Sequence, residues 1–252
     1  MHGQGEHCGR YLHVPHFLSP PITDIYLLDL RGHGRSEGLR GHVNRFDEYT
    51  EDLAVFVSAS RERFSARYGS VPEMHLYGHS MGGLIVLRLL ILRPELHFTS
   101  AAITAPLLGL KMAVPGYKKA LAYALSSVWG SLQLGSELDL SLLSRDKNVQ
   151  EAYSKDLLIH DKATPRFFTE LQKVMADTLK HTNGFESPLL FMVPMQDGIV
   201  DSEVTLAYVR EIQDAKKDLK IYAEDRHEIL NEVDKEQAFE DLKKWILKNS
   251  TK

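Results

Sequence analysis

Short runs of apolar residues alternate along the chain with longer segments in which apolar residues recur every three or four positions. The short runs have the length of buried strands, and the longer segments have the period of amphipathic helices. This alternation is typical of an α/β fold, in which a mainly parallel sheet is flanked by helices. We therefore expect strands at residues 25–30, 74–77, 98–104, 189–193 and 219–223, and helices at residues 46–68, 81–92 and 234–248.

The alternation stops between residues 107 and 184, where we expect helical or irregular structure and no strand. We interpret residues 107–184 as a helical cap inserted over one end of the sheet, and residues 1–106 and 185–252 as the core domain. The first part of the cap is strongly apolar and includes Leu121 and Trp129. Two interpretations stay open: these residues form the cap's own core, or they form an acyl-chain tunnel or a lid that touches a membrane.

The composition is that of an ordinary globular protein, with 43% hydrophobic and 25% charged residues in a chain of 252. The net charge is -4 and basic residues are scattered among acidic ones, so we expect no nucleic-acid partner. No apolar run reaches the roughly 20 residues that span a bilayer, and the polar, glycine-rich start is unlike a signal peptide. The single cysteine, Cys8, has no partner for an intramolecular disulfide and no catalytic signature around it. These features favour a cytoplasmic protein.

Residues 78–82, Gly-His-Ser-Met-Gly, match the G-x-S-x-G pattern of a nucleophile elbow. An apolar strand is expected directly before this segment and an apolar helix directly after it, as the elbow requires. The flanking glycines remove Cβ atoms that would collide in so tight a turn. The helix N-terminus supplies N–H groups where an oxyanion would form. We therefore predict that Ser80 is a catalytic nucleophile.

A serine hydroxyl needs an adjacent base, and around such an elbow the chain order is serine, then acid, then histidine. After the strand expected at residues 189–193, the only histidine is His227. Two aspartates follow that strand. Asp197 is followed by a glycine that permits a sharp turn, whereas Asp201 precedes a helical segment and has the character of a helix cap. We predict that Asp197 orients His227.

An acyl-transfer oxyanion needs two donors, and the N–H of Met81 is one of them. Residues 2–7, His-Gly-Gln-Gly-Glu-His, have the character of the loop that supplies the second donor, with the N–H of Gln4 in that role. Such a loop should follow a strand, yet only Met1 precedes it. We expect the first strands of the sheet to be missing and one edge of the sheet to be left open.

Taken together, the motifs closely resemble the monoacylglycerol lipase and lysophospholipase family of α/β hydrolases. The matching segments are HGQGEH at residues 2–7 with GRY at 9–11, DLRGHGRSEG at 29–38, GHV at 41–43 with Phe46, GHSMGG at 78–83, DGIVD at 197–201 and HEILNE at 227–232. The resemblance implies a cytosolic or peripheral-membrane serine esterase with a helical cap over an apolar acyl channel. It assigns Ser80, Asp197 and His227 as the triad and Gln4 and Met81 as oxyanion donors. The missing first strands depart from the family pattern.

We expect a serine hydrolase that cleaves monoacylglycerols or lysophospholipids through an acyl-enzyme intermediate, without a cofactor. His2, His7, His13 and His16 gather near the N-terminus, but they lack the spacing of a metal site, and we expect no metal. Two alternatives stay open. The same triad would serve a short-chain esterase, a thioesterase or an amidase, and the chain could be an inactive fragment or a binding scaffold.

Overall fold

A computed structural model describes residues 1–20, 22, 24–112, 114–135, 138–213 and 216–250. Within these residues a four-stranded parallel sheet has the order β1-β2-β5-β6. Its strands are β1 (His75–His79), β2 (Ser100–Thr104), β5 (Leu189–Pro194) and β6 (Lys217–Tyr222). Each connection between neighbouring strands carries at least one helix, as parallel pairing requires. These are α3 (Met81–Leu92), α6 (Pro165–Thr178) and α7 (Ser202–Glu211), respectively.

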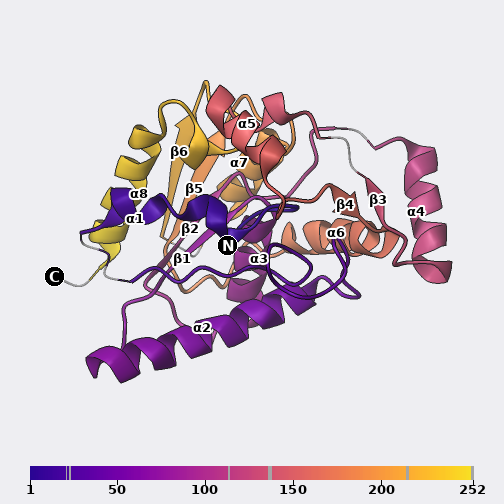
Figure 1. The fold of residues 1–252 in the computed structure, drawn as a ribbon. Coiled ribbons are helices and arrows are strands. Elements are labelled where there is room, and N and C mark those ends of the chain that lie inside the picture. Colours follow the sequence, from indigo (N-terminus) through magenta and orange to yellow (C-terminus); the bar gives the residue numbers. More distant parts are fainter. Residues whose placement is uncertain (21, 23, 113, 136–137, 214–215, 251–252) are drawn as a thin grey trace.

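Helices cover both faces of the sheet (Figure 1), and a hydrophobic cluster lies on each face. In β5, Leu189 and Phe191 pack towards α2 (Asp47–Tyr68), α3, α6 and α7, whereas Leu190 and Met192 pack towards α1 (Val14–Leu18) and α8 (Lys235–Asn249). Successive side chains of a strand point to opposite faces, and both faces are covered here. This is why the strand sequence is a continuous apolar run rather than an alternating one.

The predicted helices at residues 46–68, 81–92 and 234–248 are present as α2, α3 and α8, and four predicted strands are present as β1, β2, β5 and β6. The prediction of a strand at residues 25–30 is wrong, because the structure has no strand there. A strand is defined by its pairing. Within the described residues β1 is an edge of the sheet, so no strand lies in place to pair with this segment.

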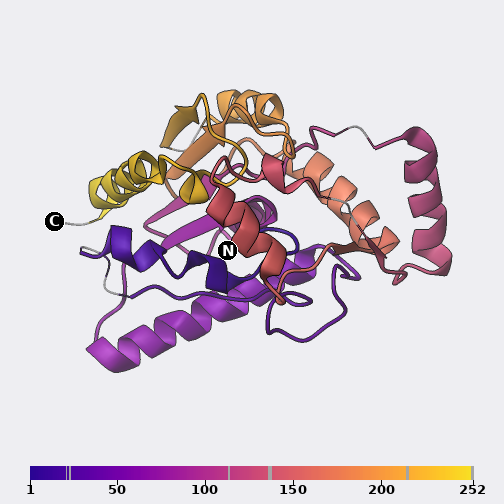
Figure 2. The ribbon, with the colours of Figure 1, turned by 45° about the horizontal axis from the view of Figure 1, so that its top comes forward.

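The segment predicted as a cap contains α4 (Gly116–Val128), the short 3-10 helix η2 (Leu140–Leu142), α5 (Lys147–Lys155) and α6. The expectation of no strand there is wrong, because β3 (Leu134–Gly135) pairs with β4 (Lys162–Ala163). Helix α6 shares the hydrophobic cluster of α3, while α4 stands away from the sheet (Figures 1 and 2). The division into a core and a cap stays a prediction.

The first residues of the chain lie inside the molecule, beside β1 (Figure 1). The Met1 amine donates to the carbonyl of Tyr77 at 2.6 Å, and the N–H of His79 donates to the carbonyl of Met1 at 3.0 Å. The 3-10 helix η1 (Cys8–Tyr11) follows soon after, and a further 3-10 helix, η3 (Ile229–Asn231), precedes α8. The bonds of Met1 hold residues 2–7 against the end of β1 and the start of α3.

Candidate active site

Ser80 occupies the turn between β1 and α3 in a strained conformation, with φ 54° and ψ −119°. Such a backbone is rare for a residue with a side chain and persists only where its surroundings enforce it. Here the Ser80 N–H donates to the carbonyl of Thr104 at 3.0 Å, across the β1–β2 ladder. A Cβ atom on Gly78 would lie 2.5 Å from the carbonyl oxygen of Gly82. The strand, turn and helix predicted around Ser80 are therefore present, and the glycines are needed for steric reasons.

The Ser80 side chain is buried at the N-terminus of α3, which has 12 residues. Within the part of the chain that the structure describes, neither the Ser80 hydroxyl nor the N–H of Met81 makes a hydrogen bond. The first N–H groups of a helix have no intrahelical acceptor and favour negative charge. The Met81 N–H is therefore available to a developing oxyanion beside Ser80.

The structure brings His227 and Asp197 together. His227 Nδ1 lies 2.7 Å from Asp197 Oδ2, and both side chains are almost completely buried. The carboxylate only accepts, so Nδ1 carries the proton and Nε2 keeps a lone pair. The His227 ring centroid lies 4.7 Å from that of His79, the residue before Ser80. The imidazole thus lies over the elbow in the tautomer that a general base needs.

The charges around His227 favour its protonated form. Burial lowers the pKa of His227, but the Asp197 carboxylate and its hydrogen bond, with Glu228 and Glu6, outweigh burial and raise it above 6.5. Burial also raises the pKa of Asp197, yet His227 and the N–H groups of Ile199 and Val200 hold it below its usual value. Asp197 Oδ1 accepts those N–H groups at 2.7 and 2.9 Å. Asp197 is therefore an ionised, fixed partner for an imidazolium.

Three other side chains that could carry catalytic chemistry are engaged elsewhere or unreactive. Asp201 caps α7 by accepting from the N–H of Glu203 at 3.1 Å. His75 Nδ1 lies 2.8 Å from the Ser100 hydroxyl. Burial raises the pKa of the Cys8 thiol to about 11, which keeps it protonated at neutral pH.

Residues 139–143 of the predicted cap contact the loops that carry Asp197 and His227. The N–H groups of His227 and Glu228 donate to the carbonyls of Leu142 and Leu143, at 3.4 and 2.8 Å. A Cβ on Gly198, directly after Asp197, would lie 2.7 Å from a Leu142 methyl group. One short segment therefore contacts both loops, and the Leu142 side chain packs closely against Gly198.

Residues 2–7, which we call the oxyanion loop after their predicted role, lie against Ser80. A Cβ on Gly3 would lie 3.2 Å from Ser80 Cβ, so the loop backbone approaches the serine side chain closely. The Gln4 side chain is held by a 3.1 Å hydrogen bond from Nε2 to the carbonyl of Lys162. Its backbone N–H makes no hydrogen bond within the described residues. Gln4 and Met81 are thus both brought to the elbow, each with an unused N–H.

Arg10 joins the oxyanion loop to the loop that carries His227. Its Nη1 donates to Glu6 Oε2 at 2.7 Å and to Glu228 Oε1 at 2.6 Å, and its Nη2 donates to Glu228 Oε2 at 2.7 Å. Glu6 Oε1 in turn accepts from the N–H of Gly3 at 2.5 Å. All three charged side chains are at least nine-tenths buried, and breaking a buried pair leaves a costly unpaired charge. We call these three residues the Arg10 network.

All three residues of the Arg10 network lie within the sequence motifs, but the motifs predict a role for none of them. The available signal was that three charges stand in the two motifs that also carry Gln4 and His227. Arg10 and Glu228 are 218 positions apart in sequence, and spacing alone does not reveal such a contact.

Two of the N-terminal histidines, His2 and His7, are held by different hydrogen-bond partners. His2 Nδ1 donates to the carbonyl of Gly3 at 2.8 Å while its Nε2 accepts from the N–H of Leu30, and His7 Nε2 lies 2.7 Å from Asp156. A search of the described residues for three or more histidine, cysteine or acidic side chains that could share a metal ion finds no such group.

Comparison with known proteins gives consistent matches. The sequence matches the family described as "Serine aminopeptidase, S33" over residues 1–234. It is 28% identical over 240 residues to "Phospholipase YtpA" of Bacillus subtilis, covering 95% of this chain and 90% of that protein. It is also 28% identical over 247 residues to an uncharacterized abhydrolase domain-containing protein of Dictyostelium discoideum, covering 98% of this chain but 26% of that protein. The crystal structure of Paleococcus ferrophilus monoacylglycerol lipase matches with a TM-score of 0.88 at 27% identity, covering 99% of this chain and 93% of the other.

The raised pKa of His227 predicts the pH dependence of turnover. A general base must be neutral, so kcat/KM for an ester should fall on the acid side, with a midpoint above pH 6.5. Asp197→Asn removes the largest of the contributions that raise this pKa, so burial should move the midpoint to lower pH while kcat falls by about 10³–10⁴-fold. Asp201→Asn is the matched control and should leave the midpoint in place. If Asp201→Asn shifted the midpoint and Asp197→Asn did not, the assignment of the acid would be reversed.

The Arg10 network predicts a positioning role for Arg10. Arg10→Met should lower kcat by about 10²-fold with little change in KM, because it releases the oxyanion loop without touching substrate. Arg10→Lys keeps the charge but loses the bidentate contact, and should restore part of the rate. Arg35→Met, on an exposed side chain, is the control. Equal losses in all three variants, or a loss explained by unfolding in circular dichroism, would contradict a positioning role.

Proposed function

The chain belongs to the serine aminopeptidase S33 family, and on that premise we propose that Ser80, His227 and Asp197 form a triad that hydrolyses single-chain acyl esters. The observation that carries the proposal is the buried 2.7 Å contact between His227 Nδ1 and Asp197 Oδ2, beside a serine in a strained elbow. The fold is the predicted α/β-hydrolase fold, and the resemblance to monoacylglycerol lipases is confirmed. The protein is a hydrolase that acts on esters, as predicted.

In the proposed mechanism His227 Nε2 takes the proton of Ser80 as Oγ attacks the ester carbonyl carbon. The N–H groups of Met81 and Gln4 stabilise the negative charge on the former carbonyl oxygen. The carbon–oxygen bond to the alcohol then breaks, and the imidazolium gives its proton to the leaving oxygen. Water attacks the acyl-enzyme by the same route and releases the carboxylic acid. Asp197 stays ionised throughout.

The proposed substrates are monoacylglycerols or lysophospholipids. Support comes from relatives at 28% identity or close to it, whose names are phospholipase and monoacylglycerol or monoglyceride lipase. The alternative activities with the same triad, a short-chain esterase, a thioesterase or an amidase, differ in the acyl-chain length of the substrate or in the bond that is cleaved. The name of the matched family, an aminopeptidase, makes an amide the substrate class most worth testing against the ester.

A fluorophosphonate probe should label Ser80, and Ser80→Ala should abolish labelling and lower ester turnover by at least about 10³-fold. The control is Ser154→Ala, which changes an exposed serine on α5. A panel of p-nitrophenyl esters, 1-monoacylglycerols, lysophosphatidylcholines and an aminoacyl anilide then fixes the substrate class. Preference for acetyl and butyryl esters, or for the anilide, would reject the lipid assignment. Turnover that survives Ser80→Ala would reject the mechanism.

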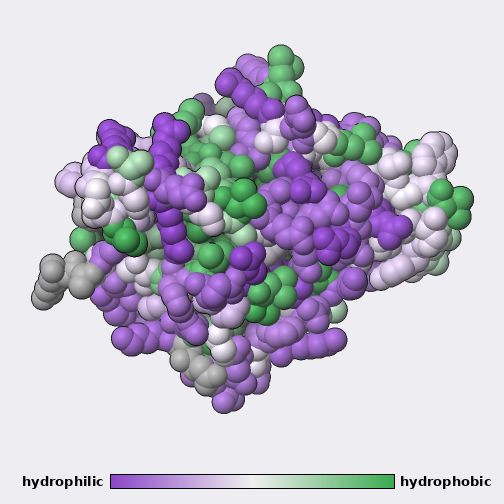
Figure 3. Space-filling model, turned by 90° about the horizontal axis from the view of Figure 1, so that it is seen from below, coloured by the Kyte–Doolittle hydropathy of each residue, from purple (hydrophilic) through white to green (hydrophobic). Residues whose placement is uncertain are grey.

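We further propose that α4 touches a lipid surface while the enzyme acts. Tyr117, Leu121 and Val128 lie on this helix at exposed positions, with Val128 87% exposed, and Trp129 follows them. Hydrophobic atoms protrude at the right-hand end of Figure 3, where Figure 1 shows α4. A helix with an exposed apolar face can lie in the boundary between lipid headgroups and acyl chains. The structure has no helix, in its described part, that is long and apolar enough to cross a bilayer.

The double variant Leu121→Ser/Val128→Ser should bind anionic vesicles of phosphatidylcholine and phosphatidylglycerol about 30-fold more weakly, since it removes about 2 kcal/mol of apolar burial. Turnover of a dispersed soluble ester should not change. Val71→Ser, at a position 86% exposed but outside α4, is the control. Vesicle flotation measures the binding of the double variant and of the control. Equal flotation of all variants would show that α4 is not the contact.

A further inference from the structure

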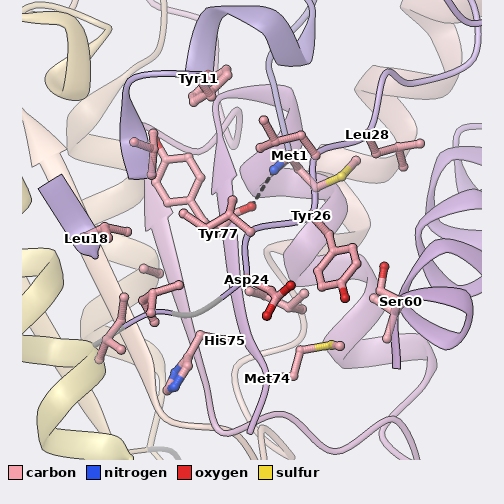
Figure 4. Close-up of a pocket in the computed structure, with 18 of the residues that line it drawn as sticks. Met1, Tyr11, Leu18, Asp24, Tyr26, Leu28, Ser60, Met74, His75 and Tyr77 are labelled. Carbon is pink, nitrogen blue, oxygen red and sulfur yellow. Dashed lines mark hydrogen bonds between the residues drawn. The ribbon is translucent and has the colours of Figure 1, made fainter. Parts of the chain in front are cut away.

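His227 follows an edge strand of the sheet. Within the described residues β6 pairs only with β5, and it ends at Tyr222, before the chain reaches His227. The other edge strand, β1, borders a cavity of about 390 Å³ between residues 24–28 and 72–77 (Figure 4). Neither His227 nor Asp197 lines that cavity. The sheet therefore supports the proposed base from one side only, and the position of the base depends on contacts outside the sheet.

Residues 141–145 of the predicted cap bond to residues 223–234, which we call the base loop after the proposed role of His227. Ser144 is completely buried, and its hydroxyl donates to the carbonyl of Asn231 at 2.9 Å. The N–H groups of two successive base-loop residues donate to carbonyls of the same cap segment, at 3.4 and 2.8 Å. Backbone and side-chain contacts thus join a segment of the predicted cap to the loop that carries the proposed base.

Arg145 adds three ionic contacts to this junction. Its Nε donates to Glu232 Oε2 at 3.1 Å, and its Nη2 donates to Asp225 Oδ1 at 3.0 Å and to Asp234 Oδ1 at 2.6 Å. One of these carboxylates precedes His227 in the chain and two follow it. A single guanidinium therefore joins the base loop before and after the imidazole. We call Arg145 and its three carboxylate partners the Arg145 latch.

Glu232 closes the base loop around His227. Its side chain is completely buried, and its carboxylate accepts from the N–H of Arg226 at 2.9 Å and from the N–H of Val233 at 3.1 Å. It also accepts from the N–H and the Nε of Arg145. The segment between Arg226 and Glu232 is therefore closed into a ring by one carboxylate. A buried carboxylate that loses its cation is strongly destabilised, so the ring depends on Arg145.

The Arg145 latch carries excess negative charge. One guanidinium faces the carboxylates of Asp225, Glu232 and Asp234. Tyr222 on β6 also lies close enough for Asp225 to raise its pKa. Burial, Asp234 and Glu232 raise the pKa of Asp225 to about 7, against the opposing effect of Arg145. Asp225 therefore ionises in the folded protein only near neutral pH, and its ionisation adds repulsion within the latch.

We propose that Arg145 is a positioning residue for His227, which holds the imidazole over Ser80 by fixing the base loop to the predicted cap. This inference rests on the proposed function of His227 as the general base. The guanidinium contacts carboxylates and no group of the proposed triad, so it acts through Glu232 and the loop backbone. A shift of about 1 Å in a catalytic group can cost about 10²-fold in rate. Ionisation of Asp225 weakens the same hold.

Arg145→Met should lower kcat for an ester by about 10²-fold with little change in KM, because the base is displaced while substrate contacts are kept. The proton on His227 Nδ1 lies in the 2.7 Å contact with Asp197 and should give a proton NMR resonance far downfield, assigned by its absence in Asp197→Asn. This resonance should broaden or disappear in Arg145→Met. Arg145→Lys keeps the charge but cannot reach three carboxylates, so it should restore part of the rate and of the resonance. Arg145→Lys also tests the proposal if Arg145→Met fails to fold.

Arg88→Met is the matched control. Arg88 also lies between two carboxylates, those of Asp47 and Asp177, and its side chain is 5% exposed, but its partners lie on α2 and α6. Both methionine variants should lower Tm by about 5 °C or more, since each removes a cation that pairs with several carboxylates. Only Arg145→Met should change kcat and the His227 resonance. Equal changes in both variants, or an unchanged resonance in Arg145→Met, would overturn the proposal.

Asp225→Asn tests the response of the Arg145 latch to pH. A carboxyl whose pKa is raised on folding stabilises the fold below its usual pKa of 3.8, and this stability is lost as the pH rises to the folded pKa of about 7. Asp225→Asn should therefore raise Tm more at about pH 8 than at about pH 5, and its kcat relative to the unmodified chain should rise through about pH 7. A gain that does not depend on pH would contradict the role of Asp225. If the unmodified chain turns over no ester, the proposed function is wrong, and the resonance and Tm still decide whether the latch positions His227.

Discussion

The tight packing of backbone at Ser80 is the constraint on which the rest of the site depends. A residue with φ 54° and ψ −119° costs about 1–3 kcal/mol and must be held by its neighbours. The N–H of Ser80 bonds to Thr104 and its carbonyl accepts from Leu107, so the ladder of the first two strands fixes the turn from one side. Gly78 and Gly82 let the strand and helix approach from the other. The position of Ser80, the proposed nucleophile, is thus set by the sheet and not by a flexible loop.

Buried charge performs a similar function for the groups around Ser80. Arg10 ties the start of the chain to Glu228, and the N–H of Glu228 is in turn held by the carbonyl of Leu143. Segments 85 to 218 residues apart in sequence therefore meet beside His227. A single cation between two carboxylates leaves excess negative charge, and this charge helps to raise the pKa of His227 above 6.5. The network that positions the loops thereby also favours the imidazolium that the proposed acyl transfer requires.

The sequence was informative wherever a local rule decides the structure. The period of apolar residues predicted α3 with its observed bounds, chain order singled out His227, and the following glycine favoured Asp197 over Asp201. Residues 25–30 were predicted to be a strand because their side chains have the pattern of one. Strand pairing, however, depends on which segment lies alongside, and the sequence of residues 25–30 does not contain that information. The contacts of Arg10 and the exposure of the apolar face of α4 were not predictable for the same reason. Both depend on elements that are distant in sequence.

The edge of the sheet and the proposed oxyanion hole depend on the same few bonds. The carbonyl of Met1 accepts from His79, directly before Ser80, and Gly3 and Gln4 follow Met1 by two and three residues. A Cβ on Gly82 would lie 2.5 Å from the carbonyl oxygens of Met1 and His2, so the same residues also press on the first turn of α3. The distance between the Gln4 N–H and the serine is therefore set by the ladder beside β1. A site that must be accurate to a fraction of an ångström gains its accuracy from that ladder, so the pairing of β1 bears on catalysis as well as on stability.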